Sequence, residues 1–490
     1  VIADSSQEMT KLGVLKLSMN DLEGLADLEK AVEMDPELPI AKITLAAAYI
    51  QSKEYDKALD VAKQWKHDQP NQVEGYNLVA KVLLLQEKTV AAEAELKHAL
   101  TIKADNAFSL LYFASKALME NKPEEAISLI NKVLNARPNY IKALVLYYRA
   151  NKVIDNTDEA VRKIANSFDS DPQNLANRLL YSRVLFIEQD FEKVIELLKN
   201  IDGNEALPPH YWILLSDSYL KTKQSAKALA VINNWIEAEP LHRAARLRKV
   251  SIQEKFNDFL GALATVDSVL KIIPTDDQFR VLRGYYLIRN KQFNIAQTQI
   301  NSLSEKLKKL PLVQGLQGEI WLTEGKHAQA ISGLKALHEM LPTPYNAALV
   351  FATLKNLKQD QSAFDFLVQH VESNPKDFIS KTFLAENAVA FDKNLAKKHY
   401  LVLLQNSPNN LPILNNLAWI EYELTNYQAA DELAVRALKL DNNNPQVLDT
   451  AGLIKLKLGK KGEAVKLLKK ASQLAPEDKE IAKHYQEVIN

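Results

Sequence analysis

The chain has 490 residues, of which 47% are hydrophobic and 25% are charged, and it contains no cysteine. Lys and Arg together number 61, as do Asp and Glu, and this zero net charge argues against a general binder of nucleic acid or anionic membranes. Without cysteine the chain has neither disulfides nor thiol chemistry, and without a run of about 18 apolar residues it has no predicted membrane span.

The beginning of the chain gives two expectations. It starts Val-Ile-Ala-Asp, with neither an initiator methionine nor a signal peptide, and we interpret it as a mature or trimmed segment. Residues 1–37 predict an atypical first repeat, in which Gly24 stands where the later repeats carry another small residue.

A small residue returns every 34 positions along most of the chain. The series is Ala58, Ala92, Ala126, Ala160, Val194, Ala228, Ala262, Ala296, Ala330, Ala363, Ala396, Ala430 and Ala464, with two steps of 33 residues after Ala330. A period of this length predicts a stack of helical hairpins, because one hairpin cannot bury its apolar face without its neighbours.

Prolines mark the boundaries between these predicted hairpins. They lie twelve residues after the small residues, at Pro36, Pro70, Pro138, Pro172, Pro240, Pro274, Pro342, Pro375, Pro408 and Pro476. Because proline lacks a backbone N–H, it is excluded from a helix interior and fits between the end of one helix and the first turn of the next.

Apolar residues recur at spacings of three and four within each unit. Trp212, Leu215 and Tyr219 share one face of a first helix, and Ala228 and Ile232 share one face of a second. The pattern resembles the tetratricopeptide repeat over nearly the whole chain. The resemblance implies an all-α fold, an α-solenoid of helix-turn-helix repeats in a right-handed superhelix, with about thirteen units of 33–34 residues over residues 38–476.

Three segments depart from the regular pattern. Residues 201–209 carry Gly203 and the Pro208-Pro209 pair, and they predict a bend. Each of the two 33-residue steps predicts a turn that is one residue shorter than in the other units. Residues 477–490 predict a polar helix that caps the last apolar face, which a repeat array needs for solubility.

The search for catalytic motifs is negative. The sequence has no glycine-rich phosphate loop, no H-E-x-x-H and no G-x-S-x-G motif. The nine histidines are scattered, at His67, His98, His210, His242, His327, His338, His370, His399 and His484. No two lie four residues apart on one helix face, so we expect no catalytic residue, no metal, no cofactor and no enzymatic activity.

Positions on one face of the first helices carry a basic strip, and the resemblance to the tetratricopeptide repeat implies that this face lines a concave groove. Lys142, Arg149 and Lys152 share this face in the unit that opens at Ile141, and Arg183 and Phe186 extend it in the next unit. Such a strip suits a carboxylate-bearing peptide or an acidic glycan through charge-assisted hydrogen bonds.

A second basic strip is predicted from Arg248, Tyr285 and Arg289. The alternative is structural. Each arginine can pair with an acidic residue of an adjacent repeat, and Arg178, Arg246 and Arg280 fall at a packing position, where their stems can cover the neighbouring helix while their charges reach water.

The unit that opens at Leu411 carries the string Asn-Asn-Leu-Ala-Trp. Asn415, Trp419 and Tyr422 fall on the predicted groove face, where an amide beside two aromatic rings can clamp an extended backbone or stack on a sugar. Trp419 fits equally well as core filler against the next hairpin.

This string, together with Val447 to Gly452 and Leu467 to Ala471, resembles the end of the TPR-repeat lipoproteins associated with the PEP-CTERM/exosortase system of Gram-negative bacteria. The lipid-bearing cysteine of those lipoproteins is absent from this chain, and Leu453 stands where their pattern has Trp. The resemblance implies a periplasmic protein that is attached to the membrane only through a lipid anchor.

We therefore expect a scaffold that binds protein or peptide partners of an envelope export or sorting system, either for exopolysaccharide or for PEP-CTERM proteins. The alternative is direct binding of an acidic polysaccharide in the groove, with the aromatic side chains as stacking platforms. We expect no nucleic-acid partner.

Overall fold

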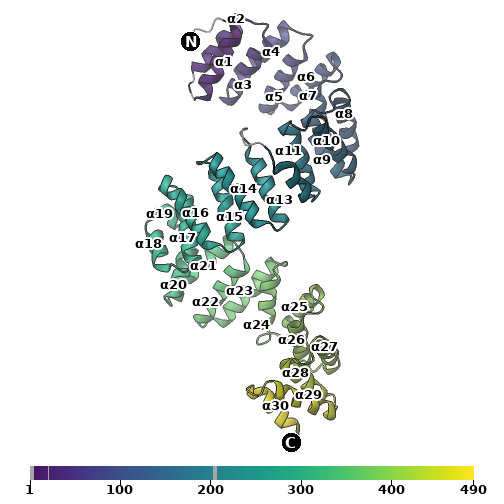
Figure 1. The fold of residues 1–490 in the computed structure, drawn as a ribbon, viewed down its shortest axis with the longest axis vertical. Helices are drawn as coiled ribbons and strands as arrows, with labels where there is room; N and C mark the ends of the chain where they lie inside the picture. Colours follow the sequence, from purple (N-terminus) through teal and green to yellow (C-terminus); the bar gives the residue numbers. More distant parts are fainter. Residues whose placement is uncertain (1–4, 20, 22, 202–206, 490) are drawn as a thin grey trace. The chain divides into compact units, whose positions relative to one another are not determined.

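The computed structural model describes residues 5–19, 21, 23–201 and 207–489, which fold into α-helices joined by short turns (Figure 1). The chain divides into two compact units, Val1–Leu241 and His242–Asn490. The helices of the first unit are α1 (Ser6–Ser18), α2 (Glu23–Met34), α3 (Pro39–Gln51), α4 (Tyr55–Asp68), α5 (Val73–Leu85), α6 (Thr89–Ile102), α7 (Ala107–Met119), α8 (Pro123–Ala136), α9 (Ile141–Val153), α10 (Asp158–Ser170), α11 (Leu175–Ile187), α12 (Phe191–Leu198), α13 (Pro209–Lys221) and α14 (Ser225–Ala238). The helices of the second unit are α15 (Arg243–Lys255), α16 (Phe259–Ile272), α17 (Asp277–Arg289), α18 (Phe293–Asn301), α19 (Glu305–Lys308), α20 (Pro311–Thr323), α21 (His327–Met340), α22 (Pro344–Asn356), α23 (Asp360–Ser373), α24 (Phe378–Ala388), α25 (Lys393–Asn406), α26 (Leu411–Glu423), α27 (Tyr427–Leu440), α28 (Pro445–Lys457), α29 (Lys461–Leu474) and α30 (Lys479–Ile489).

The described helices form fourteen consecutive hairpins, seven in each unit, with α19 as a short addition and α30 after the last hairpin. Within each unit the hairpins stack side by side in chain order (Figure 1). No strand occurs among the residues that the structure describes. The predicted all-α solenoid of helix-turn-helix repeats is confirmed.

The small residue of each repeat is buried in the second helix of its hairpin. All thirteen residues of the series from Ala58 to Ala464 have no exposed surface, including the single valine, Val194. Gly24 is buried in the same way in α2, and a Cβ at this position would lie 2.5 Å from the carbonyl oxygen of Gly13 in α1. A larger side chain at these crossings would force the two helices apart.

The ten prolines of the second series all lie in the short connections between one hairpin and the next, as the spacing predicts. The two 33-residue steps lose their residue in different turns. From His327 to Pro344, the starts of α21 and α22, the chain advances 17 positions, against 18 from Asp360 to Phe378. From Phe378 to Lys393, the starts of α24 and α25, it advances 15 positions, against 16 from Leu411 to Tyr427.

A left-handed residue closes the first helix of most hairpins. These residues are Lys53, Glu87, Asn121, Asp155, Gln189, Lys223, Asn257, Lys291, Gly325, Lys358, Thr425 and Gly459. In the first of these turns the N–H of Lys53 donates to the carbonyl of Ile50, and the N–H of Glu54 donates to that of Tyr49. This is the hydrogen-bond pattern of a Schellman motif, which satisfies the last carbonyls of a helix.

The last helix covers the end of the second unit with one apolar face. Ile481 packs with Leu448 and Ala471, and Val488 packs with Ala464 and Leu468, while the charged side chains of α30 face outward. The bend expected at 201–209 falls largely on residues 202–206, which lie outside the described residues. The division of the chain at residues 37 and 476 stays a prediction.

Candidate functional site

A groove lies between the first helices of two adjacent repeats in the first unit, α7 and α9. We call this cavity of about 470 Å³ the N-terminal groove. It is lined by Phe108, Leu111, Tyr112, Ser115, Tyr140, Ile141, Lys142, Val145, Leu146 and Arg149. Its lining is mainly apolar, and Lys142 and Arg149 are exposed there.

The two cationic side chains of the N-terminal groove are not neutralised by carboxylates of the described residues. Neither Lys142 nor Arg149 forms an ion pair with a described residue, whereas nearby Glu93 is held by Lys116, with 2.5 Å between Oε1 and Nζ. That hydrogen bond and charge, which outweigh the effect of burial, lower the pKa of Glu93. The groove therefore presents positive charge beside an apolar surface.

The structure separates the rest of the first predicted strip from this groove. Lys152, Arg183 and Phe186 are not among its lining residues. Lys152 lies over the ring of Tyr148, with Nζ 5.8 Å from the ring centroid, and Phe186 packs edge-on against Phe191 at 5.2 Å. Arg183 is exposed on α11 and has no ion-pair partner among the described residues.

The second predicted strip is largely occupied by contacts within the protein. The guanidinium of Arg289 pairs with the carboxylate of buried Glu319 and lies between two rings, 5.0 Å from the centroid of Tyr285 and 4.8 Å from that of Tyr345. The Tyr345 hydroxyl donates to Oε2 of Glu319 at 2.8 Å, and the Tyr285 hydroxyl donates to Oε1 of Glu254 at 2.7 Å. A partner could reach Arg289 only by displacing these bonds.

The electrostatics of this network follow from burial. Desolvation opposes the charge of Arg289, but Glu319, Tyr345 and Tyr285 together outweigh it and raise the pKa of the guanidinium. Arg248, the third member of the strip, is half-buried, and desolvation lowers its pKa. For Arg289 the structural alternative of the sequence analysis, charge pairing between adjacent repeats, is the arrangement observed, and the Tyr285 hydroxyl is also bonded to an adjacent repeat.

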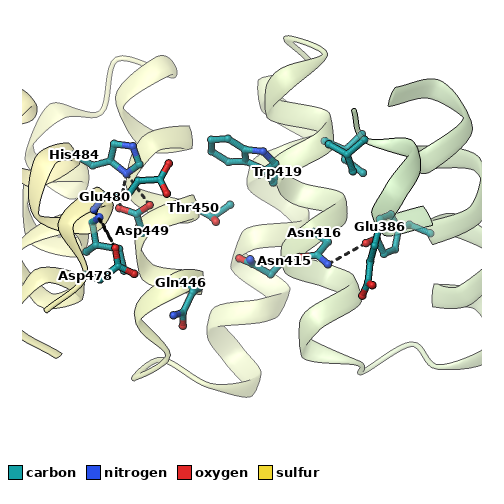
Figure 2. Close-up of a pocket in the computed structure, with 14 residues that line it drawn as sticks. Glu386, Asn415, Asn416, Trp419, Gln446, Asp449, Thr450, Asp478, Glu480 and His484 are labelled. Atoms are coloured by element: carbon teal, nitrogen blue, oxygen red, sulfur yellow. Dashed lines mark hydrogen bonds and ion pairs between the residues drawn. The ribbon is translucent and has the colours of Figure 1, made fainter. Parts of the chain in front are cut away.

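A second cavity lies in the second unit, along the first helices of its last repeats and the terminal helix (Figure 2). We call this cavity of about 500 Å³ the C-terminal pocket. Its lining residues are Glu386, Val389, Tyr400, Asn415, Asn416, Trp419, Ile420, Gln446, Asp449, Thr450, Asp478, Glu480, Ile481 and His484. Four of them are carboxylates, and none is Lys or Arg.

The predicted residues Asn415 and Trp419 both line the C-terminal pocket. Tyr422 does not line it but stacks on Trp419, with ring centroids 5.1 Å apart and an interplanar angle of 23°. Asn416 donates from Nδ2 to the Tyr400 hydroxyl at 3.0 Å. The side-chain oxygen of Asn415 is buried and has no hydrogen-bond partner among the described residues.

The carboxylates of the pocket differ in their surroundings. Asp449 is buried and contacts Nδ1 of His484 at 2.9 Å (Figure 2). Burial raises the pKa of Asp449, and the hydrogen bond with His484 opposes that rise in part. Asp478 accepts hydrogen bonds from the backbone N–H groups of Glu480 and Ile481 and so caps α30. Glu386 and Glu480 are exposed, with no ion pair to any described residue.

Three of the lining residues missed by the sequence analysis lie one period from residues that it found. Phe108 and Ser115 precede Lys142 and Arg149 by 34 positions, and Asp449 follows Asn415 by 34. The signal was therefore present in the repeat itself, because the same helix positions of neighbouring repeats line one surface.

A chain of hydrogen bonds links two histidines and an aspartate in the same unit. Nε2 of His338 lies 2.8 Å from Nδ1 of His370, whose Nε2 lies 3.0 Å from Oδ2 of Asp377. Because the N–H at Nε2 of His370 donates a hydrogen bond to the carboxylate of Asp377, Nδ1 of His370 is left to accept a hydrogen bond from Nε2 of His338. Burial and the neighbouring His370 lower the pKa of His338.

We expect the stability of the protein to fall as the pH drops from about 7.5 to 5.5, because the unfolded chain then binds protons that folded His338 does not. Folding lowers the pKa of His338 from its ordinary value of 6.5, so the loss of stability begins as the pH approaches 6.5 from above. Thermal unfolding at several pH values should show a smaller pH slope for His338→Gln than for the unchanged protein. His67→Gln, at a site that is 85% exposed, should leave the slope unchanged. Equal slopes for both variants would remove His338 as the cause.

No group of three or more His, Cys, Asp or Glu side chains among the described residues is arranged to hold a metal ion. None of the helices in that part of the chain is both long and apolar enough to cross a membrane.

Family models of the tetratricopeptide repeat match residues 23–82 and residues 445–478. The chain is 29% identical over 174 residues to the TPR repeat-containing protein PA4667 of Pseudomonas aeruginosa, a match that covers 34% of this chain and 29% of that protein. It is 32% identical over 111 residues to the cellulose synthase operon protein C of Pseudomonas fluorescens, covering 22% of this chain and 9% of that protein. The matches thus span less than a third of either relative.

Among solved structures, the crystal structure of the APC/C hetero-tetramer Cut9–Hcn1 matches 100% of this chain and 97% of that chain, with a TM-score of 0.40 and 15% identity. These values are too low to support an inference about function. The repeat models at both ends of the chain and the fourteen hairpins between them agree with the 34-residue pattern. The chain therefore contains tetratricopeptide repeats at residues 23–82 and 445–478, within an array of helical hairpins of the same period.

Proposed function

We propose that the chain is a non-enzymatic scaffold that binds segments of partner proteins along the first helices of its repeats. The observation that carries this proposal is the N-terminal groove, where an apolar cavity of about 470 Å³ adjoins Lys142 and Arg149. An apolar cavity takes up a side chain, and free cations beside it pair with carboxylates. The combination fits an extended segment with apolar and acidic residues.

We place this scaffold in the periplasm, in a system for exopolysaccharide biosynthesis or export or for the sorting of PEP-CTERM proteins, attached to the membrane through a lipid anchor. Two observations support this placement. The sequence resembles the lipoproteins of the PEP-CTERM/exosortase system, and 111 residues are similar to a protein named for a cellulose synthase operon.

Direct binding of an acidic polysaccharide remains the second candidate function. The charges of the C-terminal pocket count against it there, because the four carboxylates around Trp419 repel a polyanion. An acidic polysaccharide would be expected to bind at the N-terminal groove. Titration of the purified protein with such a polysaccharide tests this candidate against the peptide-binding function.

The test measures binding of a fluorescent peptide that contains glutamate and leucine to the full chain. The double variant Lys142→Glu/Arg149→Glu should weaken binding about thirtyfold, since each reversal replaces an attraction of roughly 0.5 kcal/mol by a repulsion of similar size, which makes about 2 kcal/mol for the two exposed sites. Lys152→Glu provides the matched control, because Lys152 lies on the same helix outside the groove. Unchanged binding by the double variant, or an equal loss in the control, would contradict the proposal.

A further inference from the structure

The C-terminal pocket has the opposite charge to the N-terminal groove. We infer that the C-terminal pocket binds an extended partner segment that carries lysine or arginine, held by its carboxylates and by Trp419. This inference rests on the proposed scaffold function and adds a second site with a ligand of different chemistry.

The charge of the lining side chains favours a cationic ligand in this pocket. Its lining includes Glu386, Asp449, Asp478 and Glu480 and no Lys or Arg, so only His484 offers a positive charge within the lining. His484 is already in contact with Asp449, and one oxygen of Asp478 caps α30. Glu386 and Glu480 have no ion pair among the described residues and are exposed, so both can receive an ammonium or guanidinium group.

Two further side chains suit a lysine or arginine in a peptide rather than a small cation. Trp419 offers an aromatic surface for the aliphatic stem and for the charge at its end, and Tyr422 stacked on it holds its ring in place. The buried, unpartnered oxygen of Asn415 is an acceptor that a peptide N–H can satisfy.

The length of the pocket also favours an extended peptide as its ligand. Its lining runs from α24 through α26 and α28 to α30 (Figure 2). Packed helices stand about 8–10 Å apart, so these three steps span roughly 24–30 Å. An extended peptide rises about 3.3 Å per residue and therefore covers this distance with about seven to nine residues.

The experiment compares two labelled peptides of about nine residues, one alternating lysine with alanine and one alternating glutamate with alanine, by fluorescence anisotropy with the full chain at low salt. We expect the lysine peptide to bind in a manner that depends on the pocket carboxylates, whereas any binding of the glutamate peptide should depend on Lys142 and Arg149 of the N-terminal groove. The double variant Glu386→Gln/Glu480→Gln should weaken binding of the lysine peptide about tenfold and leave the circular dichroism spectrum unchanged.

The matched control is Glu372→Gln/Glu432→Gln, which removes the same charge from exposed positions of second helices in the same unit. An equal loss of binding in this control, or binding of the lysine peptide that the Glu386→Gln/Glu480→Gln variant leaves unchanged, would overturn the inference. If the lysine peptide fails while the acidic peptide still binds in a manner that depends on Lys142 and Arg149, the inference is wrong and the proposed function stands. If only the lysine peptide binds, and the pocket variant loses it, the N-terminal groove loses its proposed role instead.

Discussion

Replacing Glu319 by leucine is expected to lower the free energy of unfolding of the second unit by about 3–5 kcal/mol, because it leaves Arg289 buried without its counter-charge. The side chain of Glu319 is 7% exposed and that of Arg289 is 14% exposed, so solvent cannot replace the lost partner. The Tyr345 hydroxyl would lose its acceptor as well. Urea unfolding followed by circular dichroism, together with hydrogen exchange of α17 and α20, measures the effect where it arises.

Two matched variants test this explanation. Glu423→Leu removes a carboxylate that pairs with Lys393 at 2.7 Å on the surface, where the side chains are 32% and 40% exposed, and it should cost less than about 1 kcal/mol. The double variant Arg289→Met/Glu319→Leu should recover most of the loss, because it removes both charges and fills the space. If Glu319→Leu costs no more than Glu423→Leu, the network does not stabilise the fold and Arg289 is available to a partner, as the sequence first suggested.

The periodic part of the fold could be predicted because each repeat meets the same physical requirement. The two helices of each hairpin cross closely at Ala58 and its equivalents, so this buried position requires a small residue. Pro70 and its equivalents require a turn, because proline is excluded from a helix interior. The left-handed turn residues could not be predicted in this way. Lys223 and Lys291 adopt φ values of 59° and 58° without any glycine signal, since backbone hydrogen bonds of the Schellman motif rather than the side chain select this conformation.

The candidate sites were predictable only where one helix supplies the residues. Lys142 and Arg149 lie on one helix face, and the structure places both at one groove. Whether an arginine is free depends on the next repeat, and the sequence alone gave no reason to pair Arg289 with Glu319, 30 positions away. The same holds for the C-terminal pocket, because Glu480 belongs to a helix that the sequence analysis described only as a cap.

The hairpin of α20 and α21 depends on glycine for the close approach of its helices, and Gly333→Ala is expected to destabilise it by about 1–3 kcal/mol. A Cβ at Gly333 would lie 2.3 Å from the carbonyl oxygen of Gln314, which is a backbone atom and cannot swing aside. Alanine gains about 1 kcal/mol over glycine from helix propensity, but this gain is smaller than the cost of separating two packed helices. The midpoint of urea unfolding should therefore fall.

Gly462→Ala provides the control with the same chemistry and no steric conflict. A Cβ at Gly462, in the first turn of α29, would meet nothing within 4 Å. Its unfolding midpoint should stay the same or rise, by up to about 1 kcal/mol in stability. Because both changes add one methyl group to a helical glycine, the difference between them isolates the close contact. A Gly333→Ala variant as stable as Gly462→Ala would show that the hairpin can open slightly without cost, and that Gly333 does not set the distance between α20 and α21.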